Sequence, residues 1–63
     1  MTKEEYDKIA NGFYLAYEQC DLEEGSRISI VQDLLSHSFK KADKEFDEKD
    51  FENRCMYGVD NVI

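Results

Sequence analysis

The segment TKEEYDKIANGFYLAYEQC, residues 2–20, gives the clearest indication of the fold. Its apolar residues recur every three or four positions, the spacing that lines one face of an α-helix. These residues are Tyr6, Ile9, Ala10, Phe13, Ala16, Tyr17 and Cys20. Thr2 is a favourable N-cap, and Glu5 three positions later completes a capping-box pattern. The segment therefore predicts a long helix with one buried stripe.

A second apolar stripe predicts another long helix over about residues 27–46. Its members are Ile28, Val31, Leu34, Leu35, Phe39, Ala42 and Phe46, and Ile30 widens it. Gly25 can break the chain before this helix, and Ser26 can cap it. The step from Phe46 to Phe51 spans five residues, which breaks the stripe. We therefore expect a bend at about residues 47–50, with Asp47 as a candidate cap for the next helix.

The C-terminal part of the chain predicts a short third helix. It carries Phe51, Cys55 and Met56 and is expected to end at Gly58. Val62 and Ile63 beyond it are expected either to pack on the core or to fray. The chain has 63 residues, three glycines and no proline, which suits helices with short connections. We predict one all-α domain over residues 1–63, a helical hairpin of two long helices plus a short third C-terminal helix.

Acidic residues dominate the charge, with fifteen Asp and Glu against eight Lys and Arg and a net charge of −7. A nucleic-acid ligand needs cations, and an anionic membrane surface repels such a chain, so neither is an expected partner. No apolar run has the length of a signal peptide core or a membrane span. We therefore expect a cytoplasmic protein. Cys20 and Cys55 lie on apolar stripes, and we expect two buried free thiols rather than a disulfide.

No pattern in the sequence predicts catalysis, a cofactor or a metal. The single histidine, His37, would need an orienting carboxylate and a nucleophile, and its neighbouring serines point away from it on a helix. Zinc binding by Cys20, Cys55 and His37 would lack any C-x2-C pair. A calcium loop that began at Asp43 would have Glu48 at the position that requires glycine. We expect a non-enzymatic protein without a cofactor.

The acidic residues form two blocks, which raises the question of a binding role. Residues 1–24 carry a net charge of −5 and residues 42–63 carry −4, whereas residues 25–41 carry +2. One interpretation is a solvated surface that keeps the chain soluble. The other is a row of carboxylates that imitates phosphates and occupies a basic groove. The candidate partner-binding residues are Glu18, Asp21, Glu23, Glu24, Asp43, Glu45, Asp47, Glu48, Asp50 and Glu52, with Tyr14 as an aromatic anchor.

Opposite charges four positions apart recur between residues 40 and 54 and favour helix there. The pairs are Lys41–Glu45, Lys44–Glu48, Glu45–Lys49 and Asp50–Arg54. This pattern leaves four carboxylates of the second block as the least neutralised. They are Asp43, Asp47, Asp50 and Glu52.

In size and charge the chain resembles small acidic helical proteins of phages and other mobile elements that inhibit CRISPR or restriction nucleases as DNA mimics. The resemblance implies an inhibitor whose target is a nucleic-acid-handling protein with a basic surface. The alternative is a small helical interaction module or regulator that binds through apolar contacts, for example as a homodimer through Tyr14 and Leu15. A DNA-binding helix-turn-helix would rely on Arg27, Lys40 and Lys41, which are too few cations on so acidic a chain.

Overall fold

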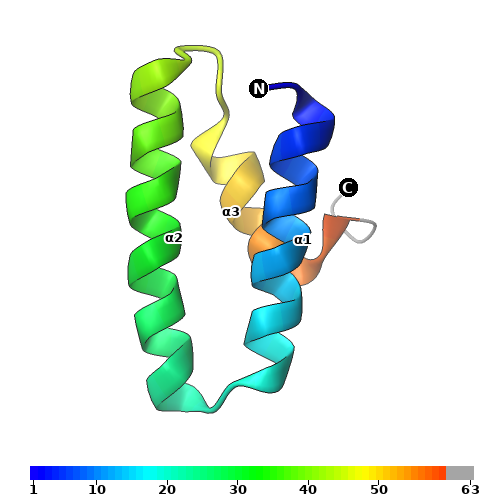
Figure 1. The fold of residues 1–63 in the computed structure, drawn as a ribbon, viewed down its shortest axis with the longest axis vertical. Coiled ribbons are helices and arrows are strands. Elements are labelled where there is room, and N and C mark those ends of the chain that lie inside the picture. Colours follow the sequence, from blue (N-terminus) through cyan, green and yellow to red (C-terminus); the bar gives the residue numbers. More distant parts are fainter. Residues whose placement is uncertain (60–63) are drawn as a thin grey trace.

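The computed structural model describes residues 1–59 and contains three α-helices in that range. They are α1 (Lys3–Gln19), α2 (Leu22–Ala42) and α3 (Glu48–Tyr57). The long helices α1 and α2 run antiparallel, and α3 packs on the upper half of the pair, most extensively against α1 (Figure 1). The predicted all-α hairpin with a short third helix is confirmed. The expectation for Val62 and Ile63 lies outside the described residues.

The helix starts follow from their caps. Thr2 Oγ1 accepts a hydrogen bond from the Glu5 N–H at 3.2 Å, and Glu5 Oε1 accepts one from the Thr2 N–H at 2.8 Å, which confirms the predicted capping box. The start of α2 is not at Ser26 as predicted. Asp21 caps it by accepting a hydrogen bond from the Glu24 N–H at 2.9 Å. A carboxylate satisfies a free N–H group and also offsets the positive end of the helix dipole, so α2 begins five residues earlier than predicted.

The end of α2 also differs from the prediction, because the helix stops at Ala42 and not at Phe46. Asp43 accepts a hydrogen bond from the Glu45 N–H at 3.0 Å, the kind of local bond by which Asp favours a turn. Lys40 Nζ donates to the Phe46 carbonyl oxygen at 3.1 Å across the connection. Residues 43–47 therefore leave the helix and carry Phe46 back over the core.

The non-helical connection removes most of the predicted charge pairs. The predicted pairs Lys41–Glu45, Lys44–Glu48 and Glu45–Lys49 each include a residue of the connection between α2 and α3. Their residues therefore do not share one helix, and these three predictions are wrong. The pair Asp50–Arg54 lies within α3 and is confirmed, with Arg54 Nε 2.9 Å from Asp50 Oδ2. Asp47 caps α3 as predicted, because it accepts a hydrogen bond from the Asp50 N–H at 3.0 Å.

Five aromatic rings hold the three helices together. Phe46 lies with its ring centroid 4.7 Å from Tyr6, 5.5 Å from Phe39 and 5.4 Å from Phe51. Phe39 is also 5.1 Å from Tyr6 and 5.7 Å from Phe51, and Phe13 is 6.4 Å from Phe51. Because the rings come from every helix and from the α2–α3 connection, this aromatic cluster is the centre of the core.

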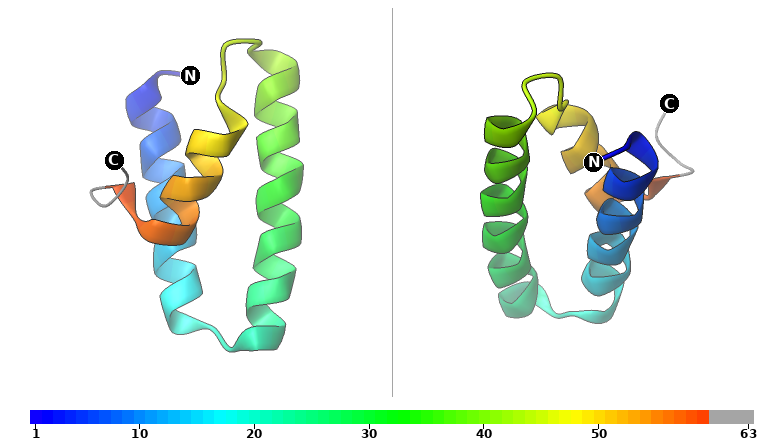
Figure 2. Two further views of the ribbon diagram at one scale, coloured as in Figure 1. Left: turned by 180° about the vertical axis from the view of Figure 1, so that it is seen from behind. Right: turned by 45° about the horizontal axis from the view of Figure 1, so that its top comes forward.

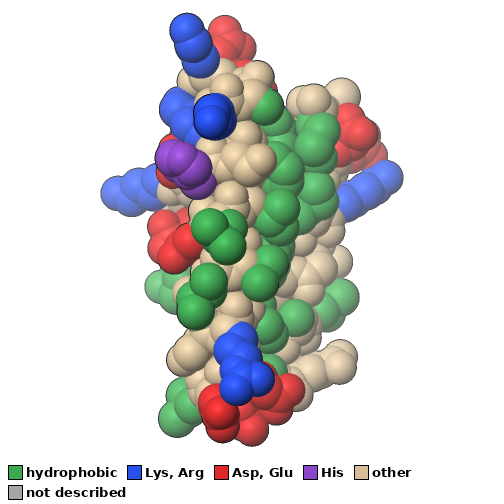
Figure 3. Space-filling model, turned by 60° about the vertical axis from the view of Figure 1, so that its left-hand side comes forward, with side chains coloured by type: hydrophobic (Ala, Val, Ile, Leu, Met, Phe, Trp, Pro, Cys, Tyr) green, Lys and Arg blue, Asp and Glu red, His purple; other side chains and the backbone are tan. Residues whose placement is uncertain are grey.

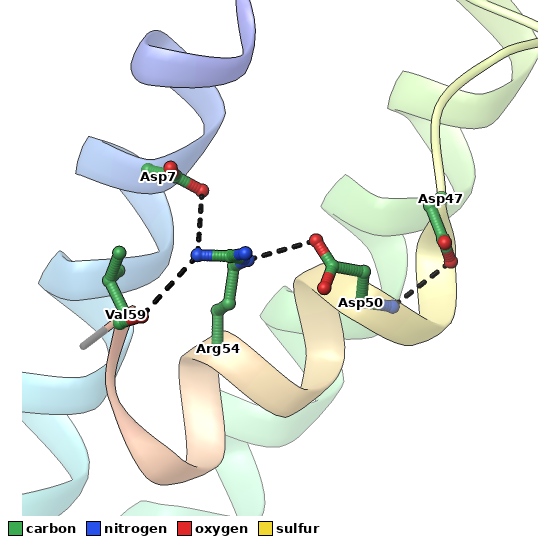
Figure 4. A network of polar contacts seen from close by, with 5 residues as sticks. All are labelled: Asp7, Asp47, Asp50, Arg54 and Val59. Atoms are coloured by element: carbon green, nitrogen blue, oxygen red, sulfur yellow. Dashed lines mark hydrogen bonds and ion pairs between the residues drawn. The ribbon is translucent and has the colours of Figure 1, made fainter. Parts of the chain in front are cut away.

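An arginine links the C-terminal end of the described chain to α1 and α3. Arg54 Nη1 lies 3.6 Å from Asp7 Oδ1 and donates to the Val59 carbonyl oxygen at 3.4 Å, while its Nε bonds Asp50 (Figure 4). Gly58 ends α3 with φ 90°, the left-handed region that favours glycine, as predicted from the sequence. Within residues 1–59 no helix combines the length and the apolar character that a membrane crossing requires.

The aromatic cluster predicts a large loss of stability on truncation of Phe46, whose ring is 5 % exposed. Phe46→Ala should lower the free energy of unfolding by about 3–5 kcal/mol, since it removes a ring that contacts three others. A chain this small has only a few kcal/mol of stability, so the variant should be largely unfolded at 25 °C. Leu22→Ala is the control, because Leu22 is 93 % exposed. Urea titration followed by circular dichroism measures both, and equal midpoints would contradict the role of the cluster.

Candidate functional site

Helix α2 turns polar side chains towards the interior and apolar side chains towards solvent. Gln32 is 3 % exposed and Ser36 is 8 % exposed. Ile30, Val31 and Leu34 are 61 %, 50 % and 66 % exposed, and we call these three residues the outer face of α2. The expected burial of Val31 and Leu34 is therefore wrong. Buried polar groups and clustered exposed apolar groups are the informative departures from ordinary burial, so this inversion marks a candidate site.

The position of Phe39 in the aromatic cluster explains the inversion. Residues three, four and seven positions apart share one face of a helix, so the packing of the half-buried Phe39 against Phe51 turns Gln32 and Ser36 to the interior as well. The Tyr17 hydroxyl donates a hydrogen bond to Gln32 Oε1 at 2.7 Å, which satisfies the buried amide oxygen. Burial also raises the pKa of the Tyr17 hydroxyl, so it remains a neutral donor. Throughout residues 1–59 no buried side-chain nitrogen or oxygen lacks a partner.

An apolar groove between α1 and α2 adjoins the outer face of α2. It is lined by Ile9, Gly12, Phe13, Ala16, Arg27, Ile28 and Val31. Val31 belongs to both surfaces, so the apolar area is continuous. The reverse view shows α3 against the upper half of the hairpin only (Figure 2). On the α2 side of the molecule, hydrophobic side chains gather along the middle, most cations lie towards the top, and acids together with a cation lie at the bottom (Figure 3).

The charges on α2 cancel. The residues that offset one another are Glu23, Glu24 and Asp33 against Arg27, Lys40 and Lys41. The acids of the first turn and the lysines of the last turn stand at opposite ends of the helix. Since α2 contributes no net charge, the whole net charge of −7 belongs to the rest of the chain. Helix α2 therefore has two acids in its first turn and two lysines in its last turn, with Arg27 one turn before Val31 and the exposed Asp33 at its middle.

The predicted acidic residues lie in two separate groups. Glu18, Asp21, Glu23 and Glu24 lie at the α1–α2 turn. The other group lies on the α2–α3 connection and on α3, towards the opposite end of a molecule 33 Å long. Its members are Asp43, Glu45, Asp47, Glu48, Asp50 and Glu52, and four of them (Asp43, Glu45, Asp47 and Asp50) line one hollow with Asp7, Lys3 and Arg54. The structure thus brings together most of the second block but does not join the two blocks.

Several of these carboxylates have structural partners. Asp21 and Asp47 cap helices, Asp43 holds the turn after α2, and Asp50 pairs with Arg54. The expectation that Asp50 is among the least neutralised acids is therefore wrong, because Arg54 pairs with it. Asp43 and Asp47 accept backbone hydrogen bonds that shape the helix ends. Glu24, Glu48 and Glu52 are exposed on the surface.

Tyr14 and the other residues considered for chemistry occupy ordinary positions. Tyr14 is half-buried, and its hydrogen-bonding neighbour Glu18 raises the pKa of its hydroxyl. His37 is exposed. Cys20 is half-buried and Cys55 is fully buried, and both are free thiols. In the part of the chain that the structure describes, no group of three or more His, Cys, Asp or Glu side chains is placed to hold a metal ion.

The apolar pattern did not predict the outer face of α2, although the sequence contains a signal for it. Ile30, Val31 and Leu34 together make the apolar arc of α2 wider than one buried stripe needs. Gln32 and Ser36 lie at the edge of this arc, next to Phe39. Comparison of the chain with protein-family models, curated proteins and solved structures gave no match. The candidate site consequently rests on geometry and charge alone.

The two thiols should differ in reactivity. Burial raises the pKa of the Cys55 thiol from 9.0 to about 12, so the reactive thiolate is scarce and inaccessible in the folded protein. A thiol reagent at pH 8 should label Cys20 in the native chain and both cysteines in denaturant, which mass spectrometry counts. The unfolded thiol loses its proton first, so stability should also fall as the pH rises from about 9 towards about 12. Fast native labelling of Cys55 would contradict its burial.

Proposed function

We propose that the protein is a non-enzymatic interaction protein that binds a protein partner through the outer face of α2. The single observation that carries the proposal is the inversion of α2, which buries Gln32 and Ser36 and exposes Ile30, Val31 and Leu34. Exposed apolar side chains that adjoin an apolar groove are a binding surface in the free protein or an aggregation hazard. Covering them with a partner removes apolar area from water and supplies the driving force of binding.

Two further features support this proposal, which also has a consequence for localisation. The three residues of the outer face of α2 are all apolar, so a partner that covers them removes mainly apolar area from water, with the exposed Arg27 and Asp33 beside this contact. The buried amide oxygen of Gln32 accepts a hydrogen bond from Tyr17, so the burial of this polar side chain is stabilised in the folded chain. The proposal places the protein in the cytoplasm, where the free thiols Cys20 and Cys55 stay reduced.

A second candidate function uses the remaining surface, on which all of the net negative charge lies. Four acids of the second block line one hollow at the α2–α3 connection, and Glu48 and Glu52 extend this negative surface along α3. Such a surface is complementary to a basic nucleic-acid-binding groove and would speed association with it. In this interpretation the protein is an acidic inhibitor of a nucleic-acid-handling enzyme, of the anti-CRISPR or anti-restriction kind.

Site-specific photo-crosslinking tests the outer face of α2. A benzoylphenylalanine at position 34 should give a discrete protein adduct in the cells that make the protein, because Leu34 is central to the face and 66 % exposed. The matched control places the same group at Leu22, which is 93 % exposed and lies at the start of α2, away from the outer face. Mass spectrometry identifies the adduct. Equal crosslinking at both positions, or none at position 34, would refute a role for this face.

Competition with nucleic acid tests the acidic surface. A target of a nucleic-acid mimic should bind the immobilised protein at low salt and be displaced by excess duplex DNA or by high salt. The double reversal Glu48→Lys/Glu52→Lys should abolish this capture. Asp33→Lys, an exposed reversal on α2, should leave most of it intact. Capture that resists DNA, or that survives the double reversal, would argue against mimicry.

A further inference from the structure

We propose that the partner of the outer face of α2 is a second copy of this chain, bound through an antiparallel pair of α2 helices. This inference rests on the proposed function and names the occupant of the same site. A twofold axis at the middle of α2 relates the two copies. The interface is then isologous, which means that each copy uses the same residues.

The spacing along the exposed side of α2 fits such a pair. Six residues follow one another at alternating steps of three and four, the pattern of the seam of a two-stranded coiled coil. They are Glu24, Arg27, Val31, Leu34, Ser38 and Lys41. All six are exposed in the single chain. The seam therefore runs along nearly the whole of α2, at an interval that keeps it facing one neighbour.

The order of residues along the seam is self-complementary only when the helices are antiparallel. A twofold axis between residues 32 and 33 places Val31 of one copy beside Leu34 of the other. The same axis places Glu24 of one copy beside Lys41 of the other. Two apolar layers then fill the centre, and an opposite-charge pair closes each end. A parallel pair would instead set Glu24 against Glu24 and Lys41 against Lys41, which like-charge repulsion opposes.

Residues beside the seam add to the central contact. Ile30 precedes Val31 and is 61 % exposed, and the half-buried Leu35 follows Leu34. Both flank the two apolar layers, where they would lose water on pairing. The half-buried Ile28 continues this apolar area towards the groove against α1. The central part of the interface is thus wider than the seam alone.

The charge distribution explains why two acidic chains could meet here. The charges on α2 sum to zero, so the net repulsion between two copies arises from residues outside the pair of helices. Within residues 1–59 most of those charged side chains are exposed to solvent, and their interactions are screened beyond about 8 Å at physiological salt. A chain of 63 residues also gains from association, because a core of this size stabilises a single copy only marginally.

Sedimentation equilibrium over a range of concentrations, with a reductant present so that Cys20 cannot crosslink, tests the pair. The wild-type chain should approach twice its mass of 7.4 kDa as its concentration rises. Leu34→Glu should remain at 7.4 kDa, whereas the control Leu22→Glu should dimerise like the wild type. Circular dichroism should show unchanged helix content for both variants, since both positions are exposed.

Charge exchange tests the antiparallel arrangement. Glu24→Lys and Lys41→Glu should each weaken the dimer about tenfold or more, because each sets like charges beside one another at both ends. An equimolar mixture of the two variants should regain the dimer, since every end of the mixed pair then has opposite charges. The double variant Glu24→Lys/Lys41→Glu should also dimerise. Failure of the mixture to recover would overturn the antiparallel arrangement.

The remaining outcomes separate this inference from the proposed function. A wild-type chain that stays at 7.4 kDa at every concentration overturns the second-copy proposal. A crosslinked adduct at position 34 with a different protein would in that case still support the outer face as a binding site. A dimer that survives Leu34→Glu and is lost in Leu15→Glu would show that the copies meet through α1. That result would overturn the second-copy proposal at this face.

Discussion

The rings of Phe39, Phe46 and Phe51 pack against one another and against Tyr6, and the arrangement of all three helices depends on this contact. One ring belongs to each helix, and Phe46 comes from the connection that folds back between α2 and α3. Edge-to-face and tilted ring pairs stabilise the fold beyond the burial of apolar area alone. This contribution matters because so small a chain buries only a limited apolar area. The cluster lies towards the end of the hairpin where α3 packs, so the other end of the α1–α2 pair has no third helix over it within residues 1–59.

The same contact decides which side of α2 faces the interior. Because Phe39 packs among the other rings, the helical period turns Gln32 inwards. The hydrogen bond from the Tyr17 hydroxyl offsets the cost of burying the Gln32 amide oxygen. The rotation leaves Val31 and Leu34 in solvent, where apolar side chains of this size are unfavourable unless a partner covers them. The binding surface that we propose is therefore a consequence of how the core is built, and it is not an addition to it.

The acidic residues divide between building the fold and shaping its surface. Asp21 and Asp47 start helices, Asp43 ends one, and Asp50 positions Arg54, which in turn contacts α1. Asp21, Asp43 and Asp47 act as hydrogen-bond acceptors where the backbone offers unpaired N–H groups. Their charge still contributes to the negative field of the surface, so a structural role and attraction to a basic partner are compatible. The charges of α2 cancel among themselves, which suits this helix better than α1 or α3 to meet a like-charged copy.

Much of the fold could be predicted from local signals in the sequence. The apolar period predicted three helices in the right order, Thr2 and Glu5 marked the first start, and Asp47 and Gly58 marked the limits of the third helix. The predicted limits of the second helix were wrong. At its start, Ser26 and Asp21 are both good caps, and the apolar pattern does not choose between them. At its end, the Asp43 side chain accepts a local backbone hydrogen bond that competes with the helix, and the apolar pattern does not predict such a bond.

The candidate site could not be predicted in the same way. The sequence by itself determined that the chain is helical, acidic and apolar along one stripe of each helix, because capping and periodicity act between residues a few positions apart. Helix α2 has an apolar arc wider than its contact with the core, and its own residues do not specify which part is buried. Only the tertiary structure decided which part of the α2 arc is buried. Phe39 packs against rings from α1, from α3 and from the α2–α3 connection, and these rings are distant from Val31 and Leu34 in the sequence.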